Sequence, residues 1–403
     1  MVDGVKNKKY LRTRRSDRYS SHSQNNTVLT QSVPETTTND PSPVFPEELF
    51  IEIFLRLPVL FLFQLRCVCK SWKTLICTPE FIKRQLMSST EYPRLISTLV
   101  TDKGTEIASY SVESVLKNQS IPVKPIINNT TNMNHYNIIG SCNGFLCLYD
   151  ILKSNAILWN PCNKFKSLIS PPIDHSMYVN QYGFGYDRAN SKYKLLVAMQ
   201  NGRNIASEIV TKIYTFGENS LKIIQNLPCT PNWYLGKCLN STLNWPVKEN
   251  GKQGMLLSFD LEKETYKQMS LPQFDEDYFY TVLLDVLQNF LCMCLEYTHQ
   301  TVVWWMKEYG VAESWTKLMI IPHPIGILNP TTMEPSFVDP LFISKNGIVL
   351  VKTMCSKLAL YNIRECNRRE KQHESAPYLI SISGFKYEPH IHIYQESLLS
   401  LQW

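Results

Sequence analysis

Few residues of this 403-residue chain have types and spacings that could carry out chemistry. Gly183-Phe184-Gly185 is a fragment of a dinucleotide-binding fingerprint, but the third glycine and the helix that should follow are missing. His390 and His392 would share one side of a strand and could bind a metal ion, yet no cysteine or carboxylate accompanies them at a recognisable ligand spacing. The sequence also contains no Gly-x-Ser-x-Gly elbow, HExxH or P-loop. We therefore expect no catalytic residue, no metal site and no cofactor, and an enzyme is the less favoured class.

Aromatic side chains are better candidates for a binding surface, because Trp and Tyr are frequent at the energetic centres of interfaces. The residues considered are Trp159, Tyr182, Tyr186, Trp233, Trp304, Trp305 and Trp315. Most aromatic residues in β-rich domains belong to the core, and sequence alone does not separate the two groups, so no target-binding residue is assigned. The acidic triplet Asp275-Glu276-Asp277 is expected to be a solvated turn.

Residues 45–86 carry more apolar side chains than so short a segment can bury alone. Pro46, followed by two glutamates, predicts the start of a helix, since proline suits the first helical position and carboxylates favour the positive end of the helix dipole. Leu49, Ile53 and Leu57 then form one apolar stripe at spacings of four. The remaining faces of this helix are also largely apolar.

Three further helical stretches follow. Pro58 ends the first helix, and the apolar residues of 60–68 and 69–76 predict two short helical segments. Thr78-Pro79-Glu80 combines a helix cap, a first-turn proline and a first-turn acid, and so predicts another start. The excess apolar surface is either buried in the core of a larger domain or left open on one face for a partner, and periodicity alone does not decide between these alternatives.

The helical segment contains, in this order, Leu57-Pro58-Val59, Arg66-x-Val68-Cys69-Lys70-x-Trp72 and Pro79-x-Phe81. In order and spacing these motifs resemble the F-box, a helical module of ubiquitin-ligase receptors in plants and animals. The resemblance implies a three-helix module that docks on a Skp-type adaptor, which joins it to a cullin and a RING subunit. Carried over position by position, the implied adaptor contacts are Phe45, Pro46, Leu49, Ile53, Leu57, Pro58, Leu65, Val68, Cys69 and Trp72. Phe45-Pro46 departs from the Leu-Pro with which the family usually opens, although the contact stays hydrophobic.

The first 44 residues differ in character from the rest of the chain. They are rich in Ser, Thr, Asn and Gln and have few apolar groups to order them, so we expect residues 1–44 to be disordered. Basic residues cluster between Lys6 and Arg18, where they form either a nuclear-import signal, a nucleic-acid contact or a solvated tail without a role. The formal charge of +6 is modest for this length, and nucleic acid is not the expected partner.

Two further features bear on the compartment. The chain has no run of about eighteen apolar residues and no apolar signal-peptide core, so no membrane partner is expected. The 12 cysteines are scattered, and several, such as Cys147, Cys292 and Cys294, lie in apolar strand-like segments. They indicate buried thiols of a reducing compartment. We therefore expect a cytoplasmic or nuclear protein.

Beyond about residue 95 the pattern changes from helical to β. Four segments share a strand, a polar turn, a second strand and a closing proline; they are 148–172, 213–228, 258–272 and 303–322. Their prolines are 56, 44 and 50 residues apart, close to the kelch-blade period of about 50 residues. Such repeats must stack to bury their apolar faces, and about six blades would fit up to the last residue. A non-repeating β-sandwich with coincidental prolines is the alternative.

Short stretches of this part resemble the plant F-box-associated domain, which follows an F-box and recruits the target. They are GSCNGFLC at 140–147, LWNP at 158–161, YGFGYD at 182–187 and VWWMKEYG at 303–310, followed by Ser314-Trp315. Asn143-Gly144 also predicts a tight hairpin turn, since both central positions need positive φ. Leu243-Asn244-Trp245 departs from the family, which often has histidine before the tryptophan, so a local change of packing is expected there.

Together these patterns predict a multidomain chain of α and all-β parts: a disordered tail over 1–44, an F-box over 45–86, a linker over 87–94 and a kelch-like, propeller-type recruiting domain over 95–403. The resemblance implies the substrate-recognition subunit of an SCF-type ubiquitin ligase, in which other subunits supply catalysis and an unidentified target protein is ubiquitinated and degraded. Two alternatives stay open, since fold does not settle function. They are a non-degradative F-box scaffold and a kelch-like carbohydrate-binding or enzymatic propeller.

Overall fold

The computed structural model describes residues 46–89, 93–101, 104–117, 126–127, 136–150, 152–162, 167–173, 177–201, 209–218, 221–231, 235–247, 254–272, 274, 281–297, 300–322, 338–353, 358–368, 378–380 and 391–399. The chain divides into two units, residues 1–46 and 47–403, and the described helices and strands belong to the second. Five sequence predictions lie outside the described residues: the disordered tail, Phe45, Trp233, the acidic triplet and His390. Within the described part of the chain, no helix is long and apolar enough to cross a membrane.

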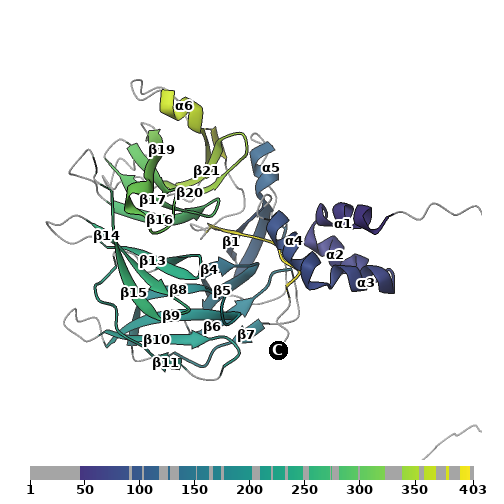
Figure 1. The fold of residues 1–403 in the computed structure, drawn as a ribbon, viewed down its shortest axis with the longest axis horizontal. Coiled ribbons are helices and arrows are strands. Elements are labelled where there is room, and N and C mark those ends of the chain that lie inside the picture. The colour runs from purple at the N-terminus through teal and green to yellow at the C-terminus, as the bar shows by residue number, and fades with distance from the viewer. Residues whose placement is uncertain are drawn as a thin grey trace, which may run out of the picture. The chain divides into compact units, whose positions relative to one another are not determined.

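Four helices open the second unit (Figure 1): α1 (Glu47–Leu55), α2 (Val59–Leu65), α3 (Lys70–Ile76) and α4 (Pro79–Ser89). The start expected at Thr78 is confirmed, because the Phe81 N–H donates to Thr78 Oγ1 at 3.2 Å and so caps α4. Pro58 separates α1 from α2, also as expected. The module thus has four helices where the resemblance implied three, and α4 continues three residues past the expected boundary at residue 86.

The helices share a small apolar core of their own. Phe54, Val59, Leu62, Ile76 and Phe81 are buried together in it. Trp72 packs edge-on against Phe54 with 5.1 Å between the ring centroids, a geometry that aromatic pairs prefer. The five residues come from all four helices, so the core fixes each helix against the others.

The remainder is built from short strands in six antiparallel groups of four that we call blades (Figure 1). Four blades are separate sheets, and the other two are joined into one sheet of eight strands. Blade 1 contains β1 (Arg94–Thr101), β2 (Gly104–Ser111), β3 (Ile126–Ile127) and, from the other end of the chain, β24 (Ile391–Tyr394). Blade 2 contains β4 (Tyr136–Cys142), β5 (Phe145–Asp150), β6 (Asn155–Trp159) and β7 (Ser167–Ile169). Blade 3 contains β8 (Met177–Asp187), β9 (Lys192–Asn201), β10 (Ile209–Thr215) and β11 (Leu221–Ile223).

Three further blades follow in the same way. Blade 4 contains β12 (Leu235–Leu239), β13 (Thr242–Val247), β14 (Met255–Asp260) and β15 (Thr265–Ser270). Blade 5 contains β16 (Thr281–Leu287), β17 (Phe290–Glu296), β18 (Gln300–Met306) and β19 (Trp315–Pro322). Blade 6 contains β20 (Val338–Ile343), β21 (Ile348–Thr353), β22 (Leu358–Asn362) and β23 (Tyr378–Ile380). Short helices α5 (Val112–Lys117), η1 (Ala312–Ser314) and α6 (Ile363–Arg368) connect or extend strands.

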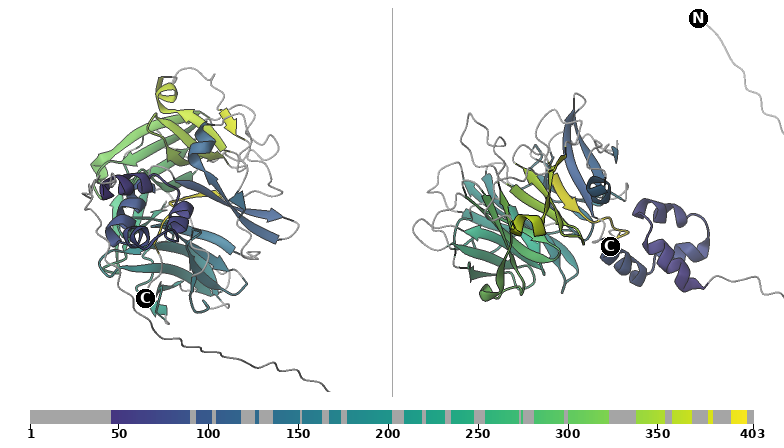
Figure 2. Two further views of the ribbon diagram at one scale, coloured as in Figure 1. Left: turned by 90° about the vertical axis from the view of Figure 1, so that its right-hand side faces the viewer. Right: turned by 90° about the horizontal axis from the view of Figure 1, so that it is seen from above.

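The blades are arranged in a ring, as expected of a propeller-type domain. The inner strands β24, β4, β8, β12, β16 and β20 contact one another in that cyclic order, and β8 and β12 also pair in parallel over two residues. Every pair of neighbouring blades encloses apolar side chains. The ring closes because β24 pairs with β1, with Arg94 opposite Tyr394; Figure 2 shows this yellow strand beside the first blade. Radial stacking of this kind protects the strand edges.

The four repeats found in the sequence correspond to the outer strands of blades 2–5. Residues 148–172 span β5 to β7, and the other three segments contain β10–β11, β14–β15 and β18–β19. Blades 1 and 6 were not found by the pattern. The Asn143-Gly144 turn between β4 and β5 is confirmed, with φ of 49° and 80°. The same two-residue turn with positive φ recurs at Asn240-Ser241 and Gln288-Asn289.

At the position of the expected packing change, Asn244 is fully buried at the interface of blades 4 and 5. Its Oδ1 accepts hydrogen bonds from Ser258 Oγ at 2.7 Å and from Tyr309 Oη at 2.9 Å. Trp245 beside it is also fully buried. The amide therefore carries a polar link between two blades inside an apolar interface.

The segment after β24 connects the helices to the ring. Gln85 of α4 is 3% exposed; its Nε2 donates to the backbone oxygen of Glu396 at 3.4 Å, and its Oε1 accepts from the Leu398 N–H at 3.3 Å. Leu398 is buried in the helical core. On the other side, Asn160 Nδ2 donates to the backbone oxygens of Ser397 and Leu399 at 3.0 and 2.9 Å. One short segment is thus bonded to α4 and to blade 2.

Glu296, at the end of β17, is a buried acid that has no counter-ion among the described residues. It is 2% exposed, and neither carboxyl oxygen has a hydrogen-bond partner among the described residues. Burial raises the pKa of Glu296 from 4.5 to about 7. Since the folded state holds this proton more tightly than the unfolded state, stability falls as pH rises from 4.5 to about 7 and then levels off.

We expect Glu296→Gln to remove this pH dependence, because the amide has the same shape and no charge. At pH 8 the variant should gain about 3 kcal/mol of unfolding free energy over the parent, whereas at pH 5 the two should differ little. Guanidinium unfolding at both pH values measures the difference. Glu262→Gln, which changes an exposed acid, is the matched control and should change neither curve; a gain at pH 8 no larger than at pH 5 would contradict the argument.

Candidate functional site

The helical module exposes large apolar side chains in the part of the chain that the structure describes. Between residues 46 and 89 they are Leu49 (47% exposed), Ile53 (52%), Leu60 (42%), Phe61 (55%), Val68 (63%) and Met87 (67%). Leu49 and Ile53 are four residues apart and so lie on the same face of α1. Exposed apolar groups concentrated on a short module indicate a surface for another protein. Of the two alternatives, the structure favours a face left open over complete burial in a larger domain.

Nine of the ten predicted adaptor contacts are described, and they fall into three groups. Three are large, exposed apolar side chains: Leu49, Ile53 and Val68. Pro46, Pro58 and Cys69 are exposed as well. Leu57, Leu65 and Trp72 are half-buried and pack against the module's own core, so that any contact they make with a partner is limited to part of each side chain. Phe45 lies outside the described residues.

Leu60, Phe61 and Met87 are exposed apolar residues that were not among the predicted contacts. The signal for Leu60 and Phe61 was present, since residues 59–63 are all apolar while a short helix can bury only one side. In α2 that side consists of Val59 and Leu62, which are buried. Which side it is depends on packing with the other helices, and the sequence does not show this.

Local backbone features position the exposed groups. Pro58 cannot continue α1, and its carbonyl oxygen accepts from the Phe61 N–H at 2.9 Å, which starts α2. Val68 lies in the turn before α3, where its N–H donates to the Leu65 oxygen at 3.1 Å. At the start of α3, hydrogen bonds from Ser71 Oγ–H and the Trp72 backbone lower the pKa of the exposed Cys69 thiol.

A second candidate region is the centre of the ring. Inner strands of all six blades line a cavity of about 1250 Å³. Lys237 Nζ lies 2.7 Å from Asp285 Oδ2, and Lys352 Nζ lies 3.8 Å from Asp339 Oδ2. Burial and the neighbouring Asp285 carboxylate raise the pKa of Asp339 to about 6. The two lysines and two aspartates balance one another, and no group of three metal-ligating side chains occurs among the described residues.

The other features considered for chemistry have structural roles. A Cβ at Gly183 would lie 2.5 Å from Leu243 Cδ1, and one at Gly185 would lie 2.4 Å from Cys238 Sγ. Both glycines are therefore explained by close packing against blade 4, and β8 continues through them as a strand. Among the aromatic residues, Trp159 and Trp315 are buried core residues, whereas Tyr182 and Tyr186 line the central cavity.

Both parts of the chain match known protein families. Residues 44–84 match the F-box domain, and residues 98–401 match the F-box associated beta propeller domain. An F-box is in general a module that binds a Skp-type adaptor, and an F-box joined to such a propeller is the architecture of a receptor. This agrees with the side chains left exposed on α1, α2 and the turn before α3.

Similar proteins are found in Arabidopsis thaliana. The F-box/kelch-repeat protein At3g23880 is 29% identical over 342 residues, which cover 81% of this chain and 90% of that protein. The F-box protein At3g07870 is 24% identical over 331 residues, covering 75% of this chain and 77% of that protein. With the family match extending over most of its length, the chain belongs to the plant F-box proteins that carry an F-box associated beta propeller domain.

Proposed function

We propose that this protein is the substrate-recognition subunit of an SCF-type ubiquitin ligase. The exposed apolar side chains of the F-box dock on the Skp-type adaptor, and the adaptor connects the chain to the cullin and RING subunits. The propeller holds a target protein near the ubiquitin-transfer machinery, which raises the effective concentration of target at that site. The chain itself contributes no catalytic residue.

The observation that carries this proposal is the exposure of Leu49, Ile53 and Val68 on an F-box that has its own core. An interface of standard size, about 1,600 Å² in total, needs a few apolar anchors at its centre. The apolar area that these side chains expose in the free chain is removed from water when a partner covers it, which stabilises the complex. We also propose that the ten contact residues carried over from the family form the adaptor interface.

We expect Ile53→Glu and Val68→Glu each to weaken adaptor binding by about 30-fold or more, because each places a charge where a buried apolar anchor is needed. Both side chains point outward, at 52% and 63% exposure, so the F-box core should stay intact. Isothermal titration calorimetry of the purified full-length chain with the adaptor measures the dissociation constant of each variant. Circular dichroism checks the fold.

Ile223→Glu is the matched control. Ile223 is 67% exposed, as Val68 is 63% exposed, but it lies on β11 of the propeller. The same change of side chain there should leave adaptor binding unaltered. Equal weakening by all three variants would show a general effect of added charge, and undiminished binding in the two F-box variants would remove the basis of the proposal.

The proposed role in target degradation needs a separate test. Proteins that co-purify with the Ile53→Glu/Val68→Glu chain, which should hold targets without passing them on, are identified, and their half-lives are then measured in cells with and without the parent chain. A partner whose half-life shortens only with the parent chain supports the ligase role. Unchanged half-lives together with normal adaptor binding would indicate the non-degradative F-box scaffold.

A further inference from the structure

Six polar side chains, one from each blade, lie at the carboxyl ends of the inner strands. Each occupies the position directly after the inner strand of its blade, and all of them line the central cavity. They are Asn143, Arg188, Asn240, Gln288, Ser344 and Gln395. Because the inner strands contact one another in cyclic order, these residues form a ring, which we call the polar ring. None of its members is buried.

Arg188 is the charged member of the polar ring. The other five are asparagine, glutamine or serine, whose neutral side chains both donate and accept hydrogen bonds. The Arg188 side chain is exposed, and its backbone N–H donates to Ser241 Oγ at 3.3 Å, which ties this position to the turn between β12 and β13 of blade 4. A neutral ring with one fixed cation suits a ligand that carries a negative group among uncharged polar groups.

The acids near Arg188 are already paired with other cations. Asp187, the preceding residue, is fully buried, and its Oδ2 lies 2.9 Å from Lys194 Nζ. The two aspartates of the cavity wall each lie beside a lysine, and Glu113 pairs with Lys117. Among the described residues, no acid is therefore left to pair with the Arg188 guanidinium group.

The size and charge of the cavity favour a peptide over other ligands. Its volume of about 1250 Å³ exceeds the roughly 300–1,000 Å³ of sites for small molecules. Side-chain amides match the N–H and C=O groups of an extended peptide backbone, and an arginine binds a carboxylate through two parallel hydrogen bonds. A nucleic acid is bound through several phosphate contacts, whereas the polar ring offers one cation.

We propose that the central cavity binds an acidic peptide segment of the target, with one carboxylate paired to Arg188 and the peptide backbone hydrogen-bonded to the neutral members of the polar ring. The inference rests on the proposed function, since it assigns the target-binding surface of the same receptor. It also names the class of target, which is a protein with an exposed, extended acidic segment. Because salt screens exposed charges, binding should weaken as ionic strength rises.

The test is a selection of random peptides displayed on phage, carried out on the purified full-length chain. The recovered peptides are synthesised, and fluorescence anisotropy measures the dissociation constant of each. We expect peptides enriched in Asp and Glu, whose affinity falls by about 10-fold or more in Arg188→Gln. This change should leave the fold intact, because glutamine already occupies the equivalent positions of blades 5 and 1, at Gln288 and Gln395.

Two further variants are selected in parallel with the parent chain. Arg188→Glu reverses the charge of the polar ring, so its pool should lose the acidic peptides and gain basic ones. Arg364→Glu is the matched control, since Arg364 is an exposed arginine of α6 that does not line the cavity. Its pool should match that of the parent chain. Peptides common to all three pools bind elsewhere, and circular dichroism checks each fold.

Adaptor binding by the same proteins separates this inference from the proposed function. Both Arg188 variants should bind the adaptor as the parent chain does, because position 188 lies in the propeller. A parent pool without acidic enrichment, the absence of any peptide that depends on Arg188, or equal weakening by Arg364→Glu would overturn the inference, whether or not the adaptor binds. Failure of the parent chain to bind the adaptor would instead count against the proposed function.

Discussion

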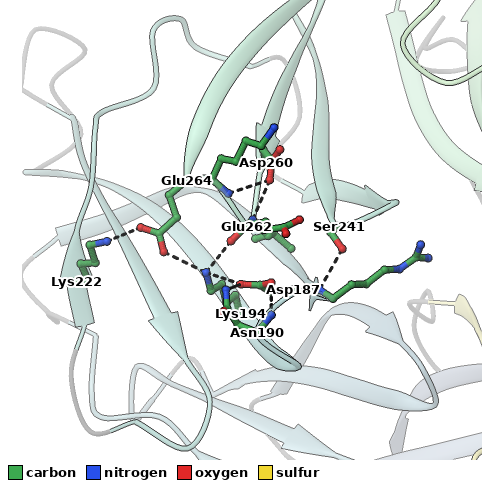
Figure 3. A network of polar contacts seen from close by, with 11 residues as sticks. Asp187, Asn190, Lys194, Lys222, Ser241, Asp260, Glu262 and Glu264 are labelled. Carbon is green, nitrogen blue, oxygen red and sulfur yellow. Dashed lines mark hydrogen bonds and ion pairs between the residues drawn. The ribbon is translucent and has the colours of Figure 1, made fainter.

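Replacing Lys194 with methionine is expected to lower the free energy of unfolding by about 3–5 kcal/mol, because a buried carboxylate loses its cation. Lys194 Nζ lies 2.9 Å from Asp187 Oδ2 and 3.1 Å from Glu264 Oε1 (Figure 3). It also donates to the backbone oxygen of Leu261 at 2.6 Å. Asp187 is fully buried in blade 3, while the other two acceptors belong to the turn between β14 and β15. The lysine therefore joins blades 3 and 4, and guanidinium unfolding at pH 7 measures its contribution.

The ionised state of this group is supported by its surroundings. Burial opposes the charge on Asp187, but hydrogen bonds from Asn190 and Lys194 outweigh it and hold the pKa of this carboxyl below its usual value of 3.8. A carboxyl with a depressed folded-state pKa contributes stability that is fully present above its unfolded pKa and is lost as pH falls through the folded value. The contribution is therefore complete at pH 7, where the variant is compared with the parent chain.

Lys222→Met is the matched control, since Lys222 also binds Glu264, at 2.6 Å, but is 67% exposed. An exposed pair of this kind contributes about 0.5 kcal/mol. The double variant Asp187→Asn/Lys194→Met should recover part of the loss, because it removes the buried charge along with its partner. Equal losses in the Lys194 and Lys222 variants would contradict a role for burial.

The helices of the F-box were predictable because their boundaries depend on neighbouring residues. Pro58 and the Thr78 cap act within one turn of the helices that they end or begin. The exposed faces were less predictable. Leu398, which lies more than 300 residues away, fills part of the helical core, and no local pattern indicates this contact. Leu60 and Phe61 were missed as exposed residues because the buried side of α2 depends on its packing with the other helices.

The propeller shows the same division between local and distant order. The outer strands of blades 2–5 form hairpins, so alternation and turn residues predicted them. Blade 1 draws β24 from the opposite end of the chain, and in blade 6 the helix α6 separates β22 from β23. Neither follows the plan of strand, turn, strand and proline.

A chain shortened to end at residue 390 is expected to lose about 5 kcal/mol or more of stability and to unfold without a single cooperative transition. The deletion removes β24, so β1 loses the partner that closes the ring. It also removes Ile391, Tyr394 and Leu398, which are 2%, 3% and 1% exposed. Burial of one such side chain contributes about 1.5–3 kcal/mol, and the whole protein has roughly 5–15 kcal/mol. Thermal melting followed by circular dichroism measures the loss.

The control is a chain that ends at Leu399. It keeps the pairing of β24 with β1, the hydrogen bond that Asn160 donates to the terminal segment and the one that Gln85 accepts from it, so its melting curve should match that of the full chain. A chain ending at 390 that melts as the full chain does would show that the ring closes without β24. The comparison therefore separates the effect of this strand from that of shortening the chain.

The same deletion bears on the proposed function, because Leu398 and Gln85 connect the segment after β24 to the F-box helices. A receptor of the proposed kind must hold its target at a defined distance from the ubiquitin-transfer subunits, since misplacement of a reacting group lowers its rate of reaction. Leu398→Ala, which retains β24, should weaken only the attachment of the helices. We expect this variant to bind the adaptor and to melt cooperatively. A ligase assembled with the variant should transfer ubiquitin to the bound target more slowly than a ligase assembled with the parent chain. An unchanged transfer rate would mean that the attachment at Leu398 is not needed to place the target.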